Sequence, residues 1–306
     1  MDKNGAEVVK YNPFISELIV IDKRGYHNKL RNLFALIKEL RNRKFDLVIN
    51  LHPSERATAM AAFSGAKQVV GFYSPGFSWF FDLPIKRQDN IHRVDDNLRI
   101  LNVMGLGQFN NRDLEMWVDD ESRKSAYQKW LQAFSQYHGP VIGLNTGGSW
   151  PTKRWTKEGF ANLADKLLAK GYGVAFFGGP MDKPDVETIV GMMNNQKSER
   201  LAVFTGKTTL LELAVLVKKC AVFVTGDSGP MHVAVSQNVH VVALFGPSDP
   251  IHCAPYSQED AVITNSSLKC LGCGQHECKM GHLCMAGINV DVLYAKISQK
   301  LNKLKP

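Results

Sequence analysis

The 306-residue sequence has no apolar run near the length of about 20 residues that a membrane-spanning helix needs. It also lacks a charged-then-apolar signal pattern at its start, low-complexity segments, and zinc-finger, RNP-type or helix-turn-helix signatures. We therefore expect a cytoplasmic, globular protein with no nucleic-acid partner. Its composition, 44% hydrophobic and 22% charged residues, is ordinary for that class.

Charge is the one compositional bias, because the formal net charge is +8. Lysines distributed along the expected helix faces account for it as an ordinary solvated surface. The alternative is attraction to an acidic partner, such as a phosphorylated lipid surface or a nucleotide diphosphate.

Short β-rich apolar runs alternate with amphipathic helical stretches along nearly the whole chain. The first expected strand is 18–21, and in the second half a strand at 141–144 precedes a helix at 157–169. This alternation predicts an α/β fold whose parallel sheets are covered by helices on both faces. The length fits two domains, which we predict at 1–118 and 119–306.

The strongest local motif is a strand that runs into a Gly/Asp/Ser-rich turn and then a helix, within 222–234. We expect the backbone N–H groups of Ser228, Gly229 and Met231 to lie at the carboxyl edge of the sheet and to bind phosphate. Asp227 is expected to hold sugar hydroxyls, because a carboxylate repels phosphate. The alternative is a helix without a ligand, with Asp227 or Ser228 as its N-cap.

A second loop, at 145–155, follows the strand 141–144 and contains two glycines, two threonines and a Lys-Arg pair. Such a loop offers N–H, O–H and cationic donors to a diphosphate, and Lys153 would neutralise charge on a leaving nucleotide. The alternative is a solvated basic loop in which Trp155 anchors the core.

Together these segments resemble glycosyltransferase family 9, which includes the lipopolysaccharide heptosyltransferases. The resemblance is carried by Thr225–His232, Leu244–Pro250 and Lys153–Trp155. Tyr11–Ile15 and Asp46–His52 resemble the family's N-terminal domain. The resemblance implies the GT-B fold: two Rossmann-like, doubly wound parallel-sheet domains that face a central cleft, the first on the acceptor side and the second binding the donor.

The resemblance also implies an activity. We expect inverting, metal-independent transfer of a sugar, heptose from an ADP-heptose-like donor, onto a lipopolysaccharide core-type acceptor at the inner face of the plasma membrane. A non-catalytic nucleotide-sugar or glycan-binding protein is the alternative. The expected donor-binding residues are Thr146, Gly147, Lys153, Asp182, Asp227, Ser228, Gly229 and His232.

The start of the sequence departs from the family pattern. Family members open with a strand, a Gly-Asp turn and a helix, and that turn carries the carboxylate thought to be the general base. Met1–Val8 shows no such unit, so we expect the first domain to be incomplete and leave the catalytic residue unassigned. His52 and Arg56 are expected on the acceptor side; the alternatives are a packed histidine and a solvated arginine.

Four of the six cysteines are close in sequence: Cys270, Cys273, Cys278 and Cys284. Because a cytosolic chain rarely forms disulfides, their spacing suggests structural zinc or an iron–sulfur cluster. The alternative is a set of free thiols in an irregular loop. The transfer itself is expected to need no cofactor.

Overall fold

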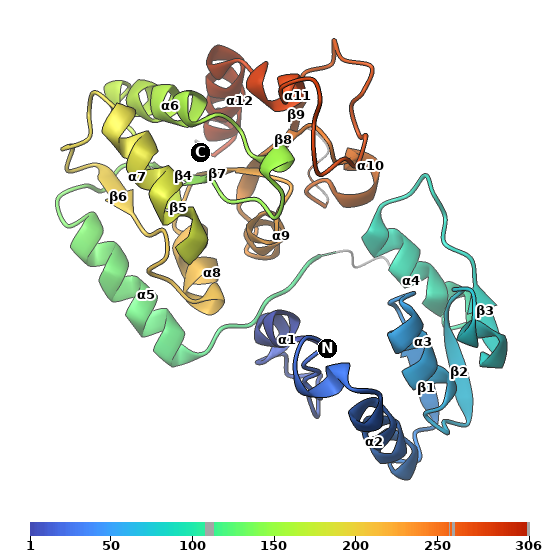
Figure 1. Ribbon diagram of the computed structural model, residues 1–306. Helices are drawn as coiled ribbons and strands as arrows, with labels where there is room; N and C mark the ends of the chain where they lie inside the picture. Colours follow the sequence, from blue (N-terminus) through green and yellow to red (C-terminus); the bar gives the residue numbers. More distant parts are fainter. Residues whose placement is uncertain (108–112, 257, 259–260, 305–306) are drawn as a thin grey trace. The chain divides into compact units, whose positions relative to one another are not determined.

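The computed structural model describes residues 1–107, 113–256, 258 and 261–304 (Figure 1). The chain forms two compact units. Unit 1 comprises Met1–Ala6 and Ser16–Arg112, and unit 2 comprises Glu7–Ile15 and Asp113–Pro306. Within the described part of the chain, no helix is long and apolar enough to cross a membrane.

Unit 1 contains a three-stranded parallel sheet in the order β1-β2-β3. Its strands are β1 (Leu47–Asn50), β2 (Gln68–Phe72) and β3 (Leu83–Ile85). The helices of this part of the chain are α1 (Lys3–Val9), η1 (Tyr26–Asn28), α2 (Leu30–Asn42), α3 (Glu55–Ala62), η2 (Phe77–Phe80) and α4 (Arg93–Val103). The small core has two clusters, one around Phe72 and Ile100 and one around Val69 and Phe81.

The strand predicted at 18–21 is wrong. This segment is extended, but among the described residues its backbone bonds only to the first one: Met1 N donates to Ile19 O at 2.8 Å, and Ile21 N donates to Met1 O at 2.7 Å. Two bonds to a single residue do not make a ladder, so an apolar β-branched run remains outside the described sheet.

Unit 2 contains a six-stranded parallel sheet in the order β6-β5-β4-β7-β8-β9. Its strands are β4 (Val141–Asn145), β5 (Gly173–Phe177), β6 (Leu201–Val203), β7 (Val222–Gly226), β8 (His240–Phe245) and β9 (Val262–Thr264). Every residue of β4, β5 and β7 is buried. Continuous apolar strands of this kind are typical of a parallel sheet covered on both faces, as the alternation predicts.

Helices cover both faces of this sheet: α6 and α12 lie above it and α5, α8 and α9 below it in Figure 1, and α7 packs against α6. The first group encloses the main buried cluster with strand side chains such as Leu144 and Phe176. The bounds are η3 (Pro151–Lys153), α5 (Asp120–Ala133), α6 (Lys157–Ala169), η4 (Pro180–Asp182), α7 (Lys183–Met192), α8 (Leu210–Lys218), α9 (Gly229–Ser236), α10 (Pro250–Cys253), α11 (Leu283–Ala286) and α12 (Val290–Asn302).

The topology determines where chemistry can occur. The carboxyl ends of β4, β5, β7 and β8 lie at one edge of the sheet because these strands are parallel neighbours. The sequence singled out the loops that follow β4, β7 and β8, and the loop after β5 leads to the predicted site residue Asp182. The order of strands therefore brings the predicted donor-binding segments to a common edge, which is where open α/β sheets bind ligands.

Candidate functional site

A pocket of about 380 Å³ lies at the carboxyl edge of the unit 2 sheet. Its walls come from the loops after β4 and β5 and from the starts of α8 and α9. The lining residues are Asn145, Gly147, Gly148, Ser149, Arg154, Gly178, Gly179, Met181, Asp182, Thr208, Thr209, Leu210, Leu213, Ser228, Gly229 and Pro230. Four of the predicted donor-binding residues are among them: Gly147, Asp182, Ser228 and Gly229.

The first turn of α9 faces this pocket without a side-chain cap from any described residue. Ser228 is the N-cap by position, but its hydroxyl lies 3.0 Å from Thr225 Oγ1 and 3.3 Å from Asn145 Nδ2. A Cβ added at Gly229 would meet no described atom within 4 Å. The side-chain N-cap considered from the sequence is therefore absent here, and the helix terminus keeps its partial positive charge.

The expectation that the Met231 N–H is free to bind phosphate is wrong. This N–H donates to Ser228 O at 3.1 Å, so this group is already used within the turn. Pro230 has no N–H to offer. The amide donors that remain for a ligand at this helix are those of Ser228 and Gly229.

Asp227 does not point into the helix turn but forms a compact ionic group with two other loops. Lys153 Nζ donates to Asp227 Oδ2 at 2.5 Å, and Ser248 Oγ donates to the same oxygen at 2.6 Å. The Lys153 and Asp227 side chains are each only 13% exposed. Burial alone would raise the pKa of Asp227, but the bonds from Lys153 and Ser248 outweigh it and hold that pKa below its usual value.

Lys153 reaches Asp227 because its backbone lies close to strand β7. A Cβ added at Gly226 would come within 2.9 Å of Lys153 O, so only glycine allows this approach. The Lys153 ammonium also lies 4.3 Å from the ring centre of Trp150, a cation–π contact. His232, on α9, adds positive charge that favours ionised Asp227. Lys153, Asp227 and His232 lie beside the pocket rather than among its lining residues.

Asp182 is buried in the pocket wall at the end of η4. It accepts from Gly179 N at 2.8 Å and pairs with Arg154 Nη2 at 3.0 Å. Gly147 has no room for a side chain, because an added Cβ would lie 2.6 Å from Asp182 Oδ2. The loops after β4 and β5 therefore meet at this carboxylate.

Thr146 lies at the start of the same loop, but its side chain is buried and does not line the pocket. Its hydroxyl has no hydrogen-bond partner among the described residues. Trp155 is also buried and packs on Phe160, as expected for a core anchor. The loop after β4 thus contains both a buried core anchor, Trp155, and a lysine that makes an ionic contact, Lys153.

In unit 1, the two predicted acceptor-side residues have local contacts. His52 is exposed, and its Nδ1 accepts from Ser54 N at 3.3 Å. Arg56, in the first turn of α3, donates to Lys23 O at 3.5 Å and to Asn28 Oδ1 at 3.4 Å. These long bonds leave the acceptor role of both residues a prediction.

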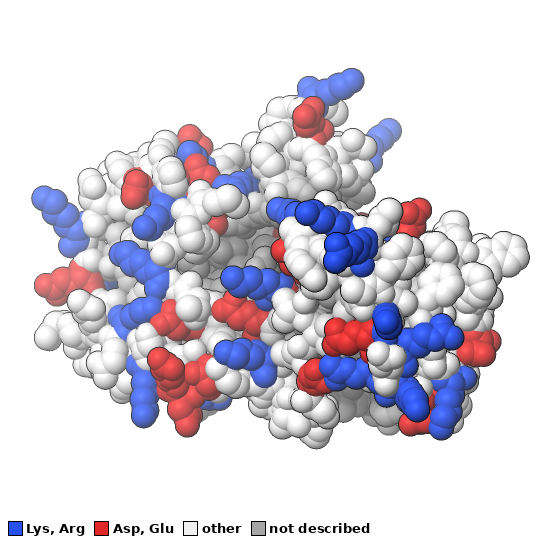
Figure 2. Space-filling model, turned by 60° about the horizontal axis from the view of Figure 1, so that its bottom comes forward, with Lys and Arg blue, Asp and Glu red and all other residues white. Residues whose placement is uncertain are grey.

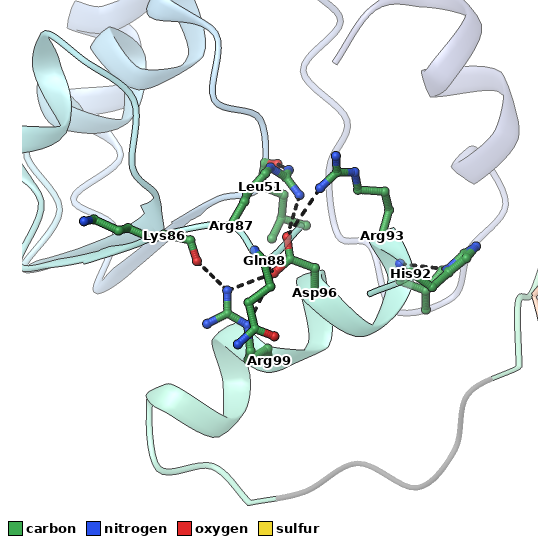
Figure 3. Close-up of polar contacts among 9 residues, drawn as sticks. Leu51, Lys86, Arg87, Gln88, His92, Arg93, Asp96 and Arg99 are labelled. Atoms are coloured by element: carbon green, nitrogen blue, oxygen red, sulfur yellow. Dashed lines mark hydrogen bonds and ion pairs between the residues drawn. The ribbon is translucent and has the colours of Figure 1, made fainter. Parts of the chain in front are cut away.

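Sequence reasoning missed the densest ionic cluster of unit 1, which Figure 3 shows around Asp96. The Asp96 side chain is 0% exposed. It pairs with Arg87 at 3.0 Å, with Arg99 at 2.8 Å and more distantly with Arg93 at 3.8 Å. The available signal was the spacing Arg93-x2-Asp96-x2-Arg99 on a helix, which places the three side chains on one face.

Two of these arginines also hold backbone around the cluster (Figure 3). Arg87 donates to Leu51 O at 2.9 Å and lies 3.8 Å from the ring centre of Phe72. Arg99 donates to Lys86 O. The cluster thus joins α4 to the segments that follow β1 and β3, which is a structural function at the carboxyl edge of the unit 1 sheet.

The four clustered cysteines form no disulfide with one another and line one small cavity of about 20 Å³. Cys270 and Cys273 are exposed, whereas Cys284 is buried. Burial raises the pKa of the Cys284 thiol. Within the described ranges, no three His, Cys, Asp or Glu side chains are arranged to hold a metal ion. The four cysteines thus line one cavity together, and a metal held there stays a prediction.

Charge of one sign does not dominate the face shown in Figure 2, where Lys and Arg lie interspersed with Asp and Glu. The net charge of +8 is therefore not gathered into a single patch on that face. The membrane contact expected from the sequence stays a prediction.

Solved structures that are similar to this chain define its fold class. A glycosyltransferase family 9 crystal structure from Veillonella parvula superimposes with a TM-score of 0.86 at 32% identity, covering 99% of this chain and 87% of that one. The E. coli heptosyltransferase WaaC, solved with ADP, has a TM-score of 0.71 at 13% identity, covering 98% and 88%. With two parallel-sheet α/β units, this chain has the GT-B fold.

The family follows from the sequence. The profile of glycosyltransferase family 9 (heptosyltransferase) matches residues 33–284, and the chain belongs to that family. The lipooligosaccharide heptosyltransferase 2 of Haemophilus influenzae is 38% identical over 125 residues, 40% of this chain and 36% of that protein. The chain spans about a third to a half of the length of the first curated relatives that it matches.

Proposed function

We propose that this protein is a glycosyltransferase that moves a heptose from an ADP-heptose-like donor onto a lipopolysaccharide core-type acceptor. The observation that carries the proposal is the pocket at the carboxyl edge of the unit 2 sheet. There the uncapped start of α9 and two glycine-containing loops surround a space of about 380 Å³, beside the Lys153 ammonium. Uncapped amides and a nearby cation are what a diphosphate requires.

The donor identity rests on likeness to relatives. WaaC was solved with ADP, and the curated relatives are named as heptosyltransferases. By analogy, the diphosphate of an ADP-linked sugar would bind the amides of Ser228 and Gly229. Asp182, which lines the same pocket at the end of η4, would accept hydrogen bonds from the nucleoside. Gly147 would allow close backbone approach.

The transfer is an inverting displacement in this proposal. The acceptor oxygen forms a bond to the anomeric carbon while the bond from that carbon to the diphosphate oxygen breaks, and ADP departs. Negative charge grows on the leaving diphosphate, and Lys153 and the α9 amides stabilise it. The hydroxyl proton passes to a general base that we do not assign. No metal is assigned to the transfer, because these groups supply the positive charge.

Lys153 and Asp227 have to exchange partners for this chemistry. Asp227 already holds Lys153 and Ser248 in the structure, so a bound donor competes for the lysine. When Lys153 turns to the phosphate, the Asp227 carboxylate becomes available to sugar hydroxyls. His232, which favours ionised Asp227, would support that state.

The acceptor side and the location in the cell are further parts of the proposal. His52 and Arg56 would contact an acidic, lipid-linked acceptor from unit 1. The net charge of +8 supports peripheral attraction to an anionic membrane at the cytoplasmic face. Structural zinc or an iron–sulfur cluster at Cys270, Cys273, Cys278 and Cys284 would be separate from the transfer.

The test is an assay for ADP release and glycosylated product with ADP-heptose and a heptose-acceptor lipopolysaccharide core. Wild-type protein is compared with Asp227→Asn, which keeps the size of the side chain, and with Asp120→Asn, an exposed carboxylate elsewhere in unit 2. We expect turnover with wild type and Asp120→Asn, and strongly reduced turnover with folded Asp227→Asn.

Two results count against the proposal. Donor binding by calorimetry without any ADP release at every acceptor tested would favour a nucleotide-sugar-binding protein. Absence of donor binding by folded wild-type protein would remove the donor site altogether.

A further inference from the structure

A five-residue segment of the cysteine-rich region, Gly272–His276, lies across two of the loops at the donor edge; we call it the strap. Its backbone bonds to the turn after β8: Gly272 N donates to Gly246 O at 2.9 Å, and Gly274 N donates to Pro247 O at 2.7 Å. That turn carries Ser248. The strap therefore fixes the backbone next to a hydroxyl that donates to Asp227.

The other end of the strap contacts the loop after β4. The buried Thr152 donates its hydroxyl proton to Gln275 O at 3.0 Å. The imidazole of His276 stacks on the Trp150 indole with ring centres 3.6 Å apart and an interplanar angle of 29°. Thr152 and Trp150 lie on η3 and at its N-cap, the turn that ends at Lys153.

The two ends of the strap thus contact two different loops, and each of these loops supplies a hydrogen-bond donor to the same carboxylate, Asp227. Lys153 and Ser248 are 95 residues apart in sequence by their numbers (248 minus 153), yet both donate to Asp227 Oδ2. The Trp150 ring that stacks on His276 is also the ring over which the Lys153 ammonium lies at 4.3 Å. A flexible lysine that sits against a fixed ring loses less freedom when it binds a ligand.

We propose that the strap is a positioning element for the donor site, and that His276 and Gln275 set the placement of Lys153 through Trp150 and Thr152. The roles of these residues rest on the proposed function, in which Lys153 contacts the donor diphosphate. The strap residues touch neither Lys153 nor Asp227 in any contact described here, so they are positioning rather than catalytic residues.

The first experiment measures the loop itself, without ligand. Amide hydrogen exchange is followed in peptides covering 150–153 and 246–249 for wild type, His276→Ala, His276→Phe and His138→Ala. Phenylalanine restores a flat ring for stacking on Trp150. His138 is an exposed histidine elsewhere in unit 2 and serves as the matched control. We expect faster exchange at 150–153 in His276→Ala only.

The second experiment measures ADP affinity of the same four proteins by calorimetry. Loss of one aromatic stack corresponds to about a two- to tenfold effect, so we expect His276→Ala to weaken ADP binding by that factor. His276→Phe and His138→Ala should bind ADP as wild type does. A general loss of structure would instead lower the thermal midpoint and would not be rescued by phenylalanine.

The outcomes separate this inference from the proposed function. Unchanged exchange at 150–153 in His276→Ala, or equal defects in the alanine and phenylalanine variants with a lowered thermal midpoint, overturns the positioning role. Failure of folded wild type to bind ADP overturns the proposed donor site, while the exchange data still decide whether the strap holds the loop.

Discussion

Each unit contains a carboxylate in an ionic cluster, Asp96 in unit 1 and Asp227 in unit 2, and the two clusters differ in composition and burial. Asp96 in unit 1 is fully buried and pairs with three arginines, two of which also donate to backbone carbonyls. Asp227 in unit 2 is 13% exposed and has one lysine and one hydroxyl. The first cluster is fixed in place, whereas the second is small and close to a pocket.

This difference separates a structural ion cluster from a functional one. An arginine held by a buried carboxylate and a carbonyl has few donors left to offer, and freeing it would leave charges unpaired. A single Lys–Asp pair beside a pocket can exchange partners at much lower cost, because water and ligand oxygens replace the lost contacts. Dense charge alone is therefore a poor guide to the site that acts on a ligand.

The largest effect should come from Asp96→Asn. It removes the charge that compensates Arg87 and Arg99, and breaking a buried pair from one side typically costs about 3–5 kcal/mol. Chemical denaturation followed by probes in unit 1 measures it. The matched control is Asp46→Asn, whose pair with Lys67 is about 80% exposed on both sides and should contribute little. Equal stability of both variants would mean that the Asp96 cluster is not structural.

The fold was largely accessible from sequence, and the exceptions have physical reasons. The helix predicted at 157–169 coincides with α6, and the helix predicted after the Gly/Asp/Ser-rich turn within 222–234 is α9. Helix α5 went unpredicted because its surface is mostly polar and Ala126 is its one buried residue among those described. Strand β3 is a three-residue edge strand that contains Pro84, which weakens any strand pattern.

The site was accessible only in part. Motifs predicted the loops, because glycine, proline and small polar residues mark turns at strand ends. Contacts between loops left no such signal: the bond from Ser248 to Asp227 spans 21 residues, and the one from Thr152 to Gln275 spans 123. Neither pair is marked by a repeating pattern in the sequence. Such contacts follow from strand order, which the sequence alone did not specify.

The next largest effect is expected from Lys153→Ala. Loss of a charge-assisted contact should weaken ADP binding by about 1.5–3 kcal/mol, and the unpaired Asp227 should add repulsion toward the diphosphate. Adding Asp227→Asn to Lys153→Ala should therefore recover part of the ADP affinity, which a calorimetric double-mutant cycle detects. Lys157→Ala, at a partly exposed lysine paired with Asp185, is the control. Additive losses would argue against the partner exchange.

A smaller effect should appear in acid. The pKa of Asp227 is lowered in the folded protein, so its pair contributes stability above the unfolded value of 3.8 and loses that contribution as pH falls through the lower, folded pKa. Wild type should therefore lose more stability than Asp227→Asn between about pH 5 and about pH 2. Denaturation midpoints measured across this range give the difference. Parallel curves would show that the pair is energetically neutral.

The smallest effect is expected from Ser248→Ala, which removes one of the two donors to Asp227. The carboxylate keeps Lys153 and is partly exposed, so water can replace the hydroxyl and the cost should be about 0.5–1.5 kcal/mol in the stability of unit 2. ADP affinity should change less than in Lys153→Ala, because the cation that meets the diphosphate is intact. If Ser248→Ala impaired ADP binding as strongly as Lys153→Ala, the hydroxyl would be holding the carboxylate in place rather than merely solvating it. Asp227 would then be fixed by its partners, as Asp96 is, and the contrast between the two clusters would fail.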